Sequence, residues 1–256
     1  MDLLYAVSGF AVGAIVGLTG VGGGSLMTPL LVLLLGVAPA TAVGTDLLYA
    51  AITKAGGVAV HTRRRHVRWD IVGRLAGGGV PGALLTIGVL TFAQFDHAAL
   101  SRIVTQSLGV ALILTALAIL FKQRIQDWGR LAAGAWRERW LGPLTIMVGF
   151  VLGVLVTLSS VGAGALGVAA LFFLYPRLST VEIVGSDIAH AVPLTLVAGL
   201  GHARLGTVDW ALLGSLLVGS LPGIWLGSLL SARVPERVLR SGLASLLAIV
   251  GGKLVL

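Results

Sequence analysis

The chain has 256 residues, of which 57% are hydrophobic and 11% are charged, and its formal net charge is +8. Soluble domains carry about 25% charged residues, so this composition leaves too little charge to coat a water-facing surface. Cysteine is absent, which excludes disulfides and thiolate sites, and the arginines lie in short segments between apolar runs, which is typical of membrane proteins and gives no reason to expect a nucleic-acid partner.

The first half of the sequence contains four apolar elements that are long enough to be membrane elements. We predict them at 4–35, 40–60, 71–92 and 101–121. The first of them is interrupted at 19–25, inside the glycine-rich stretch TGVGGGSLMTP. Long runs rich in Leu, Ala and Gly indicate helices that cross the bilayer and not barrel strands.

Between the halves lies KQRIQDWGRLAAGAWRERW at 122–140, with five basic residues and three tryptophans. Arginine and tryptophan both sit well at the membrane surface, so this stretch predicts a cytoplasmic amphipathic linker helix. It separates a first membrane repeat at 1–121 from a second at 141–256.

The second half repeats the pattern of the first. Its elements are predicted at 143–174 with a break at 159–165, then at 180–201, 210–230 and 238–256. Residues 9–24 align without gaps on 149–164, with eight of sixteen positions identical. This internal duplication predicts an all-α polytopic membrane protein built from two homologous four-element repeats.

Equivalent loops of the two halves exchange their positive charge. The segment HTRRRHVR has four arginines where its counterpart HARLGTVD has one, whereas AQFDHAALSR is nearly neutral where SARVPERVLR has three. This exchange predicts inverted repeats, each with a broken, re-entrant first element and three crossings. The arginine-rich segments would be cytoplasmic and both termini outside. Parallel repeats with full-length first helices are the alternative.

The glycine-rich breaks match neither a Walker loop nor a dinucleotide fingerprint. Irregular backbone at membrane depth is tolerated where it is buried or lines a wet cavity, and the half-helix that follows directs free amides into that cavity. We therefore predict an anion site, and close packing of helices through small residues is the alternative. The candidate residues are Thr19, Gly20, Gly22, Gly23, Gly24, Ser25, Ser159, Ser160, Gly162 and Gly164.

Four ionisable residues inside predicted membrane elements are candidates for a functional role. Asp46 and Asp187 occupy equivalent places in the two halves, and His190 shares a helix face with Asp187. Intramembrane carboxylates usually face a bundle interior, so these three are candidates for a proton relay or ion coupling. Lys54 is a candidate charge partner of an anionic substrate. The alternatives are a helix-capping role for the aspartates, a satisfied buried histidine, and a lysine that reaches the interface.

Signatures of enzymes are absent from the sequence. There is no HExxH, no GxSxG and no carboxylate cluster with metal-ligand spacing, so we expect no catalytic residues, no metal and no cofactor. No nucleotide-binding domain is present, so ATP cannot drive transport from this chain alone.

The stretch GFAVGAIVGLTGVGGGSLMTPLLVLLLGVAPATAVGTD resembles the start of the sulfite exporter TauE/SafE family, also grouped with the toluene sulfonate uptake permeases. LVTLSSVGAGALGVAAL is similar to the start of that family's second repeat. The resemblance implies a multi-pass transporter of the bacterial cytoplasmic membrane, associated with sulfite, sulfonates or other sulfur-containing anions. The second break has GAG where the first has GGG, so close amide approach is less assured there.

Together these features predict a secondary transporter for a small sulfur-containing oxyanion, bound between the two glycine-rich tips. Its partners would be that anion and the lipid bilayer, and assembly into a homo-oligomer is left open. The rival interpretations are a channel-like anion pathway and a carrier of another cargo, such as an amino acid or a metal cation. The direction of transport is also open.

Overall fold

The computed structural model describes residues 3–19, 24–33, 35–93, 96–131, 135–231 and 236–255. Throughout these ranges the regular elements are helices and no strand occurs. The helices are α1 Leu3–Thr19, α2 Gly24–Leu33, α3 Pro39–Arg63, α4 Trp69–Phe92, α5 His97–Leu120, α6 Lys122–Leu131, α7 Ala135–Ser159, α8 Ala165–Leu174, α9 Thr180–Arg204, α10 Trp210–Ser231 and α11 Glu236–Val255. This confirms the prediction of an all-helical chain.

Four described helices are long and apolar enough to cross a membrane. They are Trp69–Phe92, Ala98–Leu120, Arg139–Ser159 and Thr180–Arg204. α3 has 25 residues but carries Asp46 and Lys54 in its interior, which lowers its apolar character. The spans agree with a multi-pass membrane protein.

Helix boundaries follow the predicted elements, with one clear difference in the linker. α6 covers the first part of the predicted linker, whereas α7 begins at Ala135, inside that segment, and continues through Pro143. The prediction had started the next element at 143. A proline within a membrane helix is tolerated when neighbouring groups satisfy the backbone, so it did not mark a helix start here.

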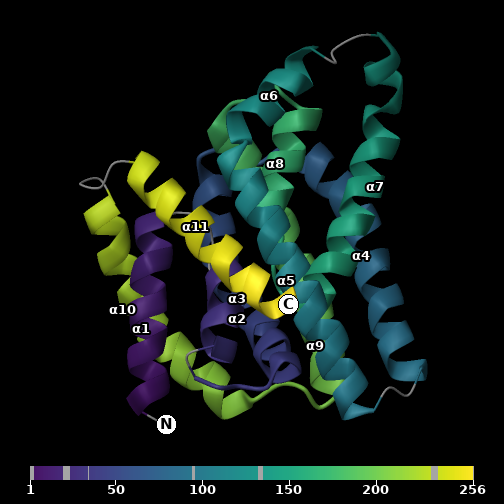
Figure 1. Cartoon of the computed structure of the whole chain (residues 1–256). Coiled ribbons are helices and arrows are strands. Elements are labelled where there is room, and N and C mark those ends of the chain that lie inside the picture. The colour runs from purple at the N-terminus through teal and green to yellow at the C-terminus, as the bar shows by residue number, and fades with distance from the viewer. Residues whose placement is uncertain are drawn as a thin grey trace.

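Two pairs of helices pack with their backbones in close contact, α1 along α10 and α4 along α7 (Figure 1). Glycines spaced four residues apart line the first interface at Gly9, Gly13, Gly219 and Gly223. A Cβ atom on Gly9 would lie only 2.9 Å from the backbone oxygen of Leu216. The same spacing recurs in the second interface at Gly78, Gly82, Gly149 and Gly153. Small residues in this pattern let membrane helices approach closely.

α3 and α9 run antiparallel through the middle of the molecule. The backbone amide of Arg68, just after α3, donates to Ser186 Oγ near the start of α9 at 2.9 Å. In the same way the amide of Asp209, just after α9, donates to Thr45 Oγ1 near the start of α3 at 3.0 Å. The two bonds give acceptors to the amides that precede α4 and α10. They also connect the end of α3 to the start of α9, and the end of α9 to the start of α3.

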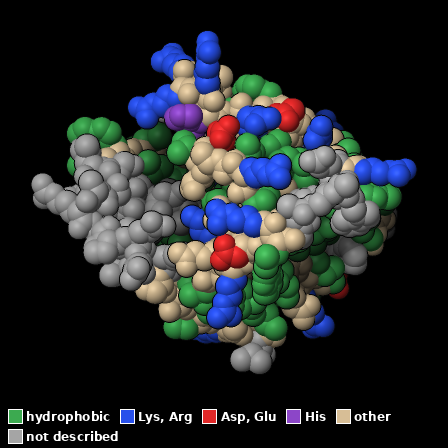
Figure 2. All heavy atoms as spheres, turned by 90° about the horizontal axis from the view of Figure 1, so that it is seen from above, with side chains coloured by type: hydrophobic (Ala, Val, Ile, Leu, Met, Phe, Trp, Pro, Cys, Tyr) green, Lys and Arg blue, Asp and Glu red, His purple; other side chains and the backbone are tan. Residues whose placement is uncertain are grey.

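The first helices of the two halves, α1 and α7, enter from opposite ends of the bundle. α7 contains the 21-residue span Arg139–Ser159, so it is longer than the half-helix that the sequence predicted there. In Figure 1 the N-terminus of α1 lies at the bottom, whereas α7 follows α6 at the top, and α8 returns from the end of α7 toward α6. Figure 2 views the molecule from above and shows Lys and Arg side chains across this upper face, with a histidine among them at one edge. Lys and Arg side chains therefore outnumber the Asp and Glu side chains on the part of the upper face that Figure 2 shows.

Candidate functional site

Buried polar side chains gather where α3 and α9 pack together beside the break between α7 and α8. Asp46 is 0% exposed, Lys54 9%, Ser160 3%, Asp187 1% and His190 0%. Each was a candidate from the sequence. Burying a charged or polar group costs free energy unless it finds a partner, so the contacts of these five residues decide what the cluster can do.

Lys54 connects α3 to the break between α7 and α8. Its ammonium donates a hydrogen bond to the backbone carbonyl of Ala163, which lies between Gly162 and Gly164. The ammonium is also within electrostatic range of both Asp46 and Asp187. Lys54 therefore points into the protein interior, toward the second glycine-rich tip, and not to the membrane interface.

Each aspartate faces the half-helix that follows a break. Thr28 Oγ1 of α2 donates to Asp46 Oδ2 at 2.5 Å, and the other oxygen, Oδ1, has no hydrogen-bond partner. Asp187 Oδ1 also has no partner, and it contacts the backbone of Gly167 in α8 so closely that a Cβ atom there would overlap it. The two carboxylates thus approach α2 and α8 in corresponding ways.

Tyr49 and His190 lie three residues after Asp46 and Asp187, respectively, and both are fully buried. Neither ring nitrogen of His190 has a hydrogen-bond partner, whereas the Tyr49 hydroxyl lies beside the Ser220 hydroxyl of α10. A Cβ atom on Gly79 of α4 would lie 2.8 Å from His190 Nε2, so the imidazole is pressed against that helix. Buried polar groups are normally paired, and such unpaired groups mark a place where water or a ligand can bind.

The break between α7 and α8 holds its backbone in conformations that favour glycine. Gly162 has φ 120° and Gly164 has φ 153°, and Ser160 has φ 57°, which is uncommon for a residue other than glycine. Ser159 Oγ donates to the carbonyl of Leu155 at 2.6 Å and accepts from the amide of Val161 at 3.2 Å. Ser159 therefore supports the turn from within.

Free donors remain at the start of α8. The amide of Gly167 donates to the carbonyl of Gly162 at 3.1 Å, and the amide of Val168 donates to that of Gly164 at 2.9 Å. The amides of residues 163–166 have no backbone acceptor in the described part of the chain. The hydroxyl of Ser160 is not one of these free donors, because it faces the Asp46 carboxylate and donates toward it. The N-terminus of a helix with free amides and its positive dipole end attracts an anion.

The first break lies largely outside the described residues. Gly20, Gly22 and Gly23 belong to the segment that is not described, and the side chains of Thr19 and Ser25 are not described either. The same holds for the surroundings of Gly24, which begins α2. Their predicted role stays a prediction.

Two residues of the cluster were missed by sequence reasoning, Thr28 and Tyr49. Thr28 looks like any hydroxyl in an apolar run, and nothing in the sequence assigns it to Asp46. Tyr49 could have been found, because the duplication aligns it with His190. Among the described residues, no group of three His, Asp or Glu side chains could hold a metal ion.

Comparison with known proteins identifies the chain's relatives. Residues 5–254 match the family described as Sulfite exporter TauE/SafE. The chain is 41% identical over 258 residues to the probable membrane transporter protein YjnA of Bacillus subtilis (strain 168), an alignment that covers all of both chains. It is 29% identical to the probable membrane transporter protein YdhB of the same strain, over 94% of this chain and 95% of that protein.

A probable membrane transporter protein of Xylella fastidiosa (strain 9a5c) is 29% identical over 88% of this chain and 83% of that protein. No solved structure matches the chain. The family and these relatives confirm the expectation of a membrane transporter and not an enzyme. With a match over nearly its whole length, this chain belongs to the sulfite exporter TauE/SafE family.

Proposed function

We propose that the chain is a secondary transporter for a small sulfur-containing oxyanion, sulfite or an organosulfonate, and that it binds this anion at the buried cluster between the two glycine-rich tips. The observation that carries the proposal is the position of the Lys54 ammonium at the second break, beside amides that lack a backbone acceptor. On this proposal Ser159, Ser160, Gly162 and Gly164 shape the second half of the site. Residues 19–25 shape the first half.

The chemistry of the donors favours an oxyanion. A sulfite or sulfonate group has several oxygens that accept hydrogen bonds, and the Lys54 ammonium and the amides of residues 163–166 can each donate to them. Charge-assisted hydrogen bonds of this kind are the strong ones in proteins. A metal cation would instead require converging carboxylates, and between Asp46 and Asp187 the cluster already holds an ammonium.

We infer that the two halves are inverted repeats. Equivalent helices α3 and α9 run antiparallel, and the bonds from Arg68 to Ser186 and from Asp209 to Thr45 join equivalent positions of the two halves. The interfaces of α1 with α10 and of α4 with α7 are likewise exchanged copies of each other. Such an arrangement supports alternating access by movement of the two halves around a fixed central site. The basic upper face of Figure 2 would be cytoplasmic.

The formal charges of the cluster suggest that transport of an anion is coupled to a proton. Lys54 with ionised Asp46 and Asp187 would carry a net charge of −1, so an anion that enters would be repelled unless a proton came with it. His190, which is buried and unpaired beside them, can take part in the same proton movement. Outward movement of a monoanion from a negative cell interior gains about 2.3 kcal/mol per 100 mV, whereas uptake needs a coupled ion. Asp46, Asp187 and His190 are the residues that would couple it.

The test is a thermal-shift screen of the purified protein in detergent with sulfite, an alkylsulfonate, thiosulfate and a panel of amino acids. The proposal expects one or more of the sulfur oxyanions to raise the melting temperature, because a ligand that binds the folded state stabilises it. If an amino acid raised it and all sulfur oxyanions left it unchanged, the proposal would be wrong.

A second measurement separates a carrier from a channel. Protein in proteoliposomes loaded with labelled sulfite is diluted into buffer with or without unlabelled sulfite. A carrier that alternates access releases label faster when unlabelled substrate is outside. Release that does not respond to external sulfite would favour a channel-like pathway.

A further inference from the structure

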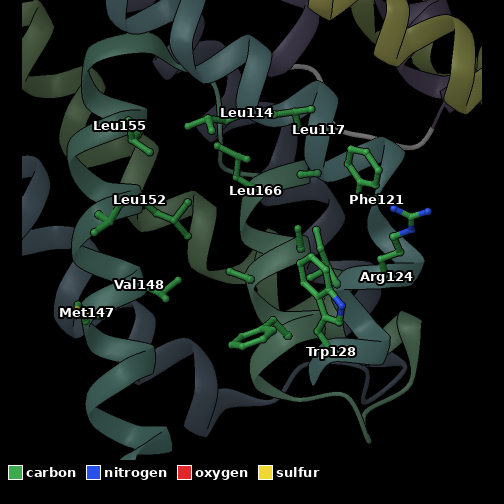
Figure 3. Close-up of a pocket in the computed structure, with 16 residues that line it drawn as sticks. Leu114, Leu117, Phe121, Arg124, Trp128, Met147, Val148, Leu152, Leu155 and Leu166 are labelled. Carbon is green, nitrogen blue, oxygen red and sulfur yellow. The ribbon is translucent and has the colours of Figure 1, made fainter. Parts of the chain in front are cut away.

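An apolar groove lies between α5, α6, α7 and α8, on the surface of the bundle and apart from the buried polar cluster (Figure 3). Its volume is about 730 Å³. Aliphatic side chains make most of its walls, among them Leu114, Leu117, Leu152, Leu155 and Leu166. In Figure 3 the side chains of α7 lie on one side and those of Phe121, Arg124 and Trp128 on the other. A space of this size with such walls fits a hydrocarbon chain.

The groove is polar at one edge, where α6 closes it. Arg124 is the one charged residue among those that line the groove. Its guanidinium lies 5.5 Å from the centre of the Phe121 ring, and no carboxylate pairs with it in the described part of the chain. The neighbouring Arg130, in contrast, pairs with Asp127 at 3.4 Å. Arg124 is therefore free to bind an anionic group brought to the groove.

α6 packs directly against α8. A Cβ atom on Gly129 would lie 2.6 Å from the backbone oxygen of Phe173 in α8, so the two helices are in direct backbone contact. Trp128, which lines the groove beside Arg124, is 61% exposed. Tryptophan and arginine on an amphipathic helix are the side chains expected at the level of lipid headgroups. We therefore expect the polar edge of the groove to lie at headgroup depth, on the upper face of the protein.

We propose that this groove is a binding site for an anionic glycerophospholipid, with an acyl chain between α5, α7 and α8 and the phosphate at Arg124. Apolar walls alone would accept any hydrophobic molecule, and an exposed arginine alone would accept any anion. The two together, with the arginine at headgroup depth, match the two ends of one phospholipid molecule. Basic sites between membrane helices at the cytoplasmic face bind anionic headgroups in this way.

The lipid would act on the half-helix that begins at the second break. Leu166 stands at the start of α8 and lines the groove, while the amides of residues 163–166 lie at the other side of the same turn. An acyl chain against Leu166 would limit the sideways movement of α8. The bound lipid would therefore stabilise the folded protein as a whole, whichever substrate it carries.

The test is native mass spectrometry of the full-length protein, released from detergent micelles that contain either phosphatidylglycerol or phosphatidylcholine with the same acyl chains. Wild type is expected to retain phosphatidylglycerol in preference to phosphatidylcholine. Arg124→Gln is expected to lower the retention of phosphatidylglycerol by about tenfold, the effect of losing one charge-assisted hydrogen bond. Arg130→Gln, on the same helix but already paired with Asp127, is the matched control and should retain it as wild type does.

A second variant tests the acyl-chain end of the site without touching the charge. Ala170→Phe places a ring in the groove and should also reduce retention, with Arg124 intact. A melting temperature within the error of wild type in lipid-free detergent shows that each variant is folded. Equal retention of the two phospholipids by wild type, or undiminished retention of phosphatidylglycerol by Arg124→Gln, would overturn the proposal.

Discussion

Replacement of Lys54 by methionine tests the proposed anion site most directly. The change removes the buried ammonium and keeps an unbranched side chain in α3. In the structure this ammonium donates to the carbonyl of Ala163 and lies within range of both Asp46 and Asp187. If an oxyanion binds there, Lys54 is its main positive partner, and its loss leaves two carboxylates facing the substrate. Both consequences weaken binding.

The expected size follows from the contacts. One hydrogen bond to a charged group contributes about 1.5–3 kcal/mol, which corresponds to a rise of about 10- to 150-fold in the dissociation constant. The two remaining carboxylates repel an anion in a region of low dielectric constant, so we expect the upper part of this range. An interaction made with the bound substrate and kept during its movement changes KM more than the rate at saturation. Lys54→Met should therefore raise KM for sulfite strongly and lower the maximal rate less.

The assay is initial uptake of labelled sulfite into proteoliposomes over a range of concentrations, with thermal shift by sulfite as an independent measure of binding. Lys253→Met is the control, because it makes the same chemical change at an exposed position in α11. Lys54→Arg should keep part of the function, since the charge remains. Wild-type KM and an unchanged thermal shift in Lys54→Met would refute the reasoning and remove the ammonium from the site.

Three further variants test the packing around the site. Gly78→Leu should destabilise the fold by about 3 kcal/mol or more, because a side chain at Gly78 would clash with the backbone of α7. In size-exclusion chromatography this variant should not elute as a single folded species, whereas the control Gly77→Leu, at a position that faces open space, should. Ser186→Ala should destabilise the protein by about 1–2 kcal/mol, measured as a lower melting temperature, since the amide of Arg68 loses its acceptor. Gly167→Ala should cost about 1–3 kcal/mol and impair sulfite transport, because the new Cβ atom displaces the carboxylate that faces α8; wild-type transport would contradict the proposed role of that carboxylate.

Much of the helix pattern could be predicted because length and polarity carry the signal. A run of about 20 apolar residues has few alternatives in a bilayer, and the glycine cluster at 159–165 marks the place where α7 ends and α8 begins. The start of α7 was less predictable. The residues from Ala135 onward fit a helix of the surface linker as well as the first turns of a membrane helix. Neither composition nor Pro143 therefore marks where the membrane helix begins.

Close helix packing through glycine could also have been predicted from the sequence, although we considered it only for the glycine-rich breaks. Close packing was considered for the breaks, whereas the structure has it at pairs spaced four apart, such as Gly9 with Gly13 and Gly149 with Gly153. This spacing is visible in the sequence and is the known pattern of closely packed membrane helices. The partner of each pair is not visible, because it lies on a helix of the other half.

The contacts of the site were the least predictable part. Lys54 could be placed at membrane depth, but its acceptor is a backbone carbonyl 109 residues away. Whether that carbonyl is free depends on the left-handed conformations at Gly162 and Gly164, which make the chain turn before α8. A side chain's charge can be read from a sequence, whereas the direction of a single carbonyl in a glycine-rich turn depends on the whole fold around it.

Differences between the two halves matter as much at this site as their likeness. A strictly repeated chain would place the same groups on both sides, and a site on the axis between them would then hold two lysines or none. Here Lys54 aligns with Thr195 and Tyr49 with His190, while the aspartates are kept in both halves. The cluster therefore has one ammonium between two carboxylates. Such an arrangement offers one positive partner to a single bound anion and leaves one carboxylate charge in excess, which a proton can neutralise when the anion enters. On the proposed function the repeated sequence would supply one tip on each side of the site, and the divergence at Lys54 supplies the positive group of the cluster.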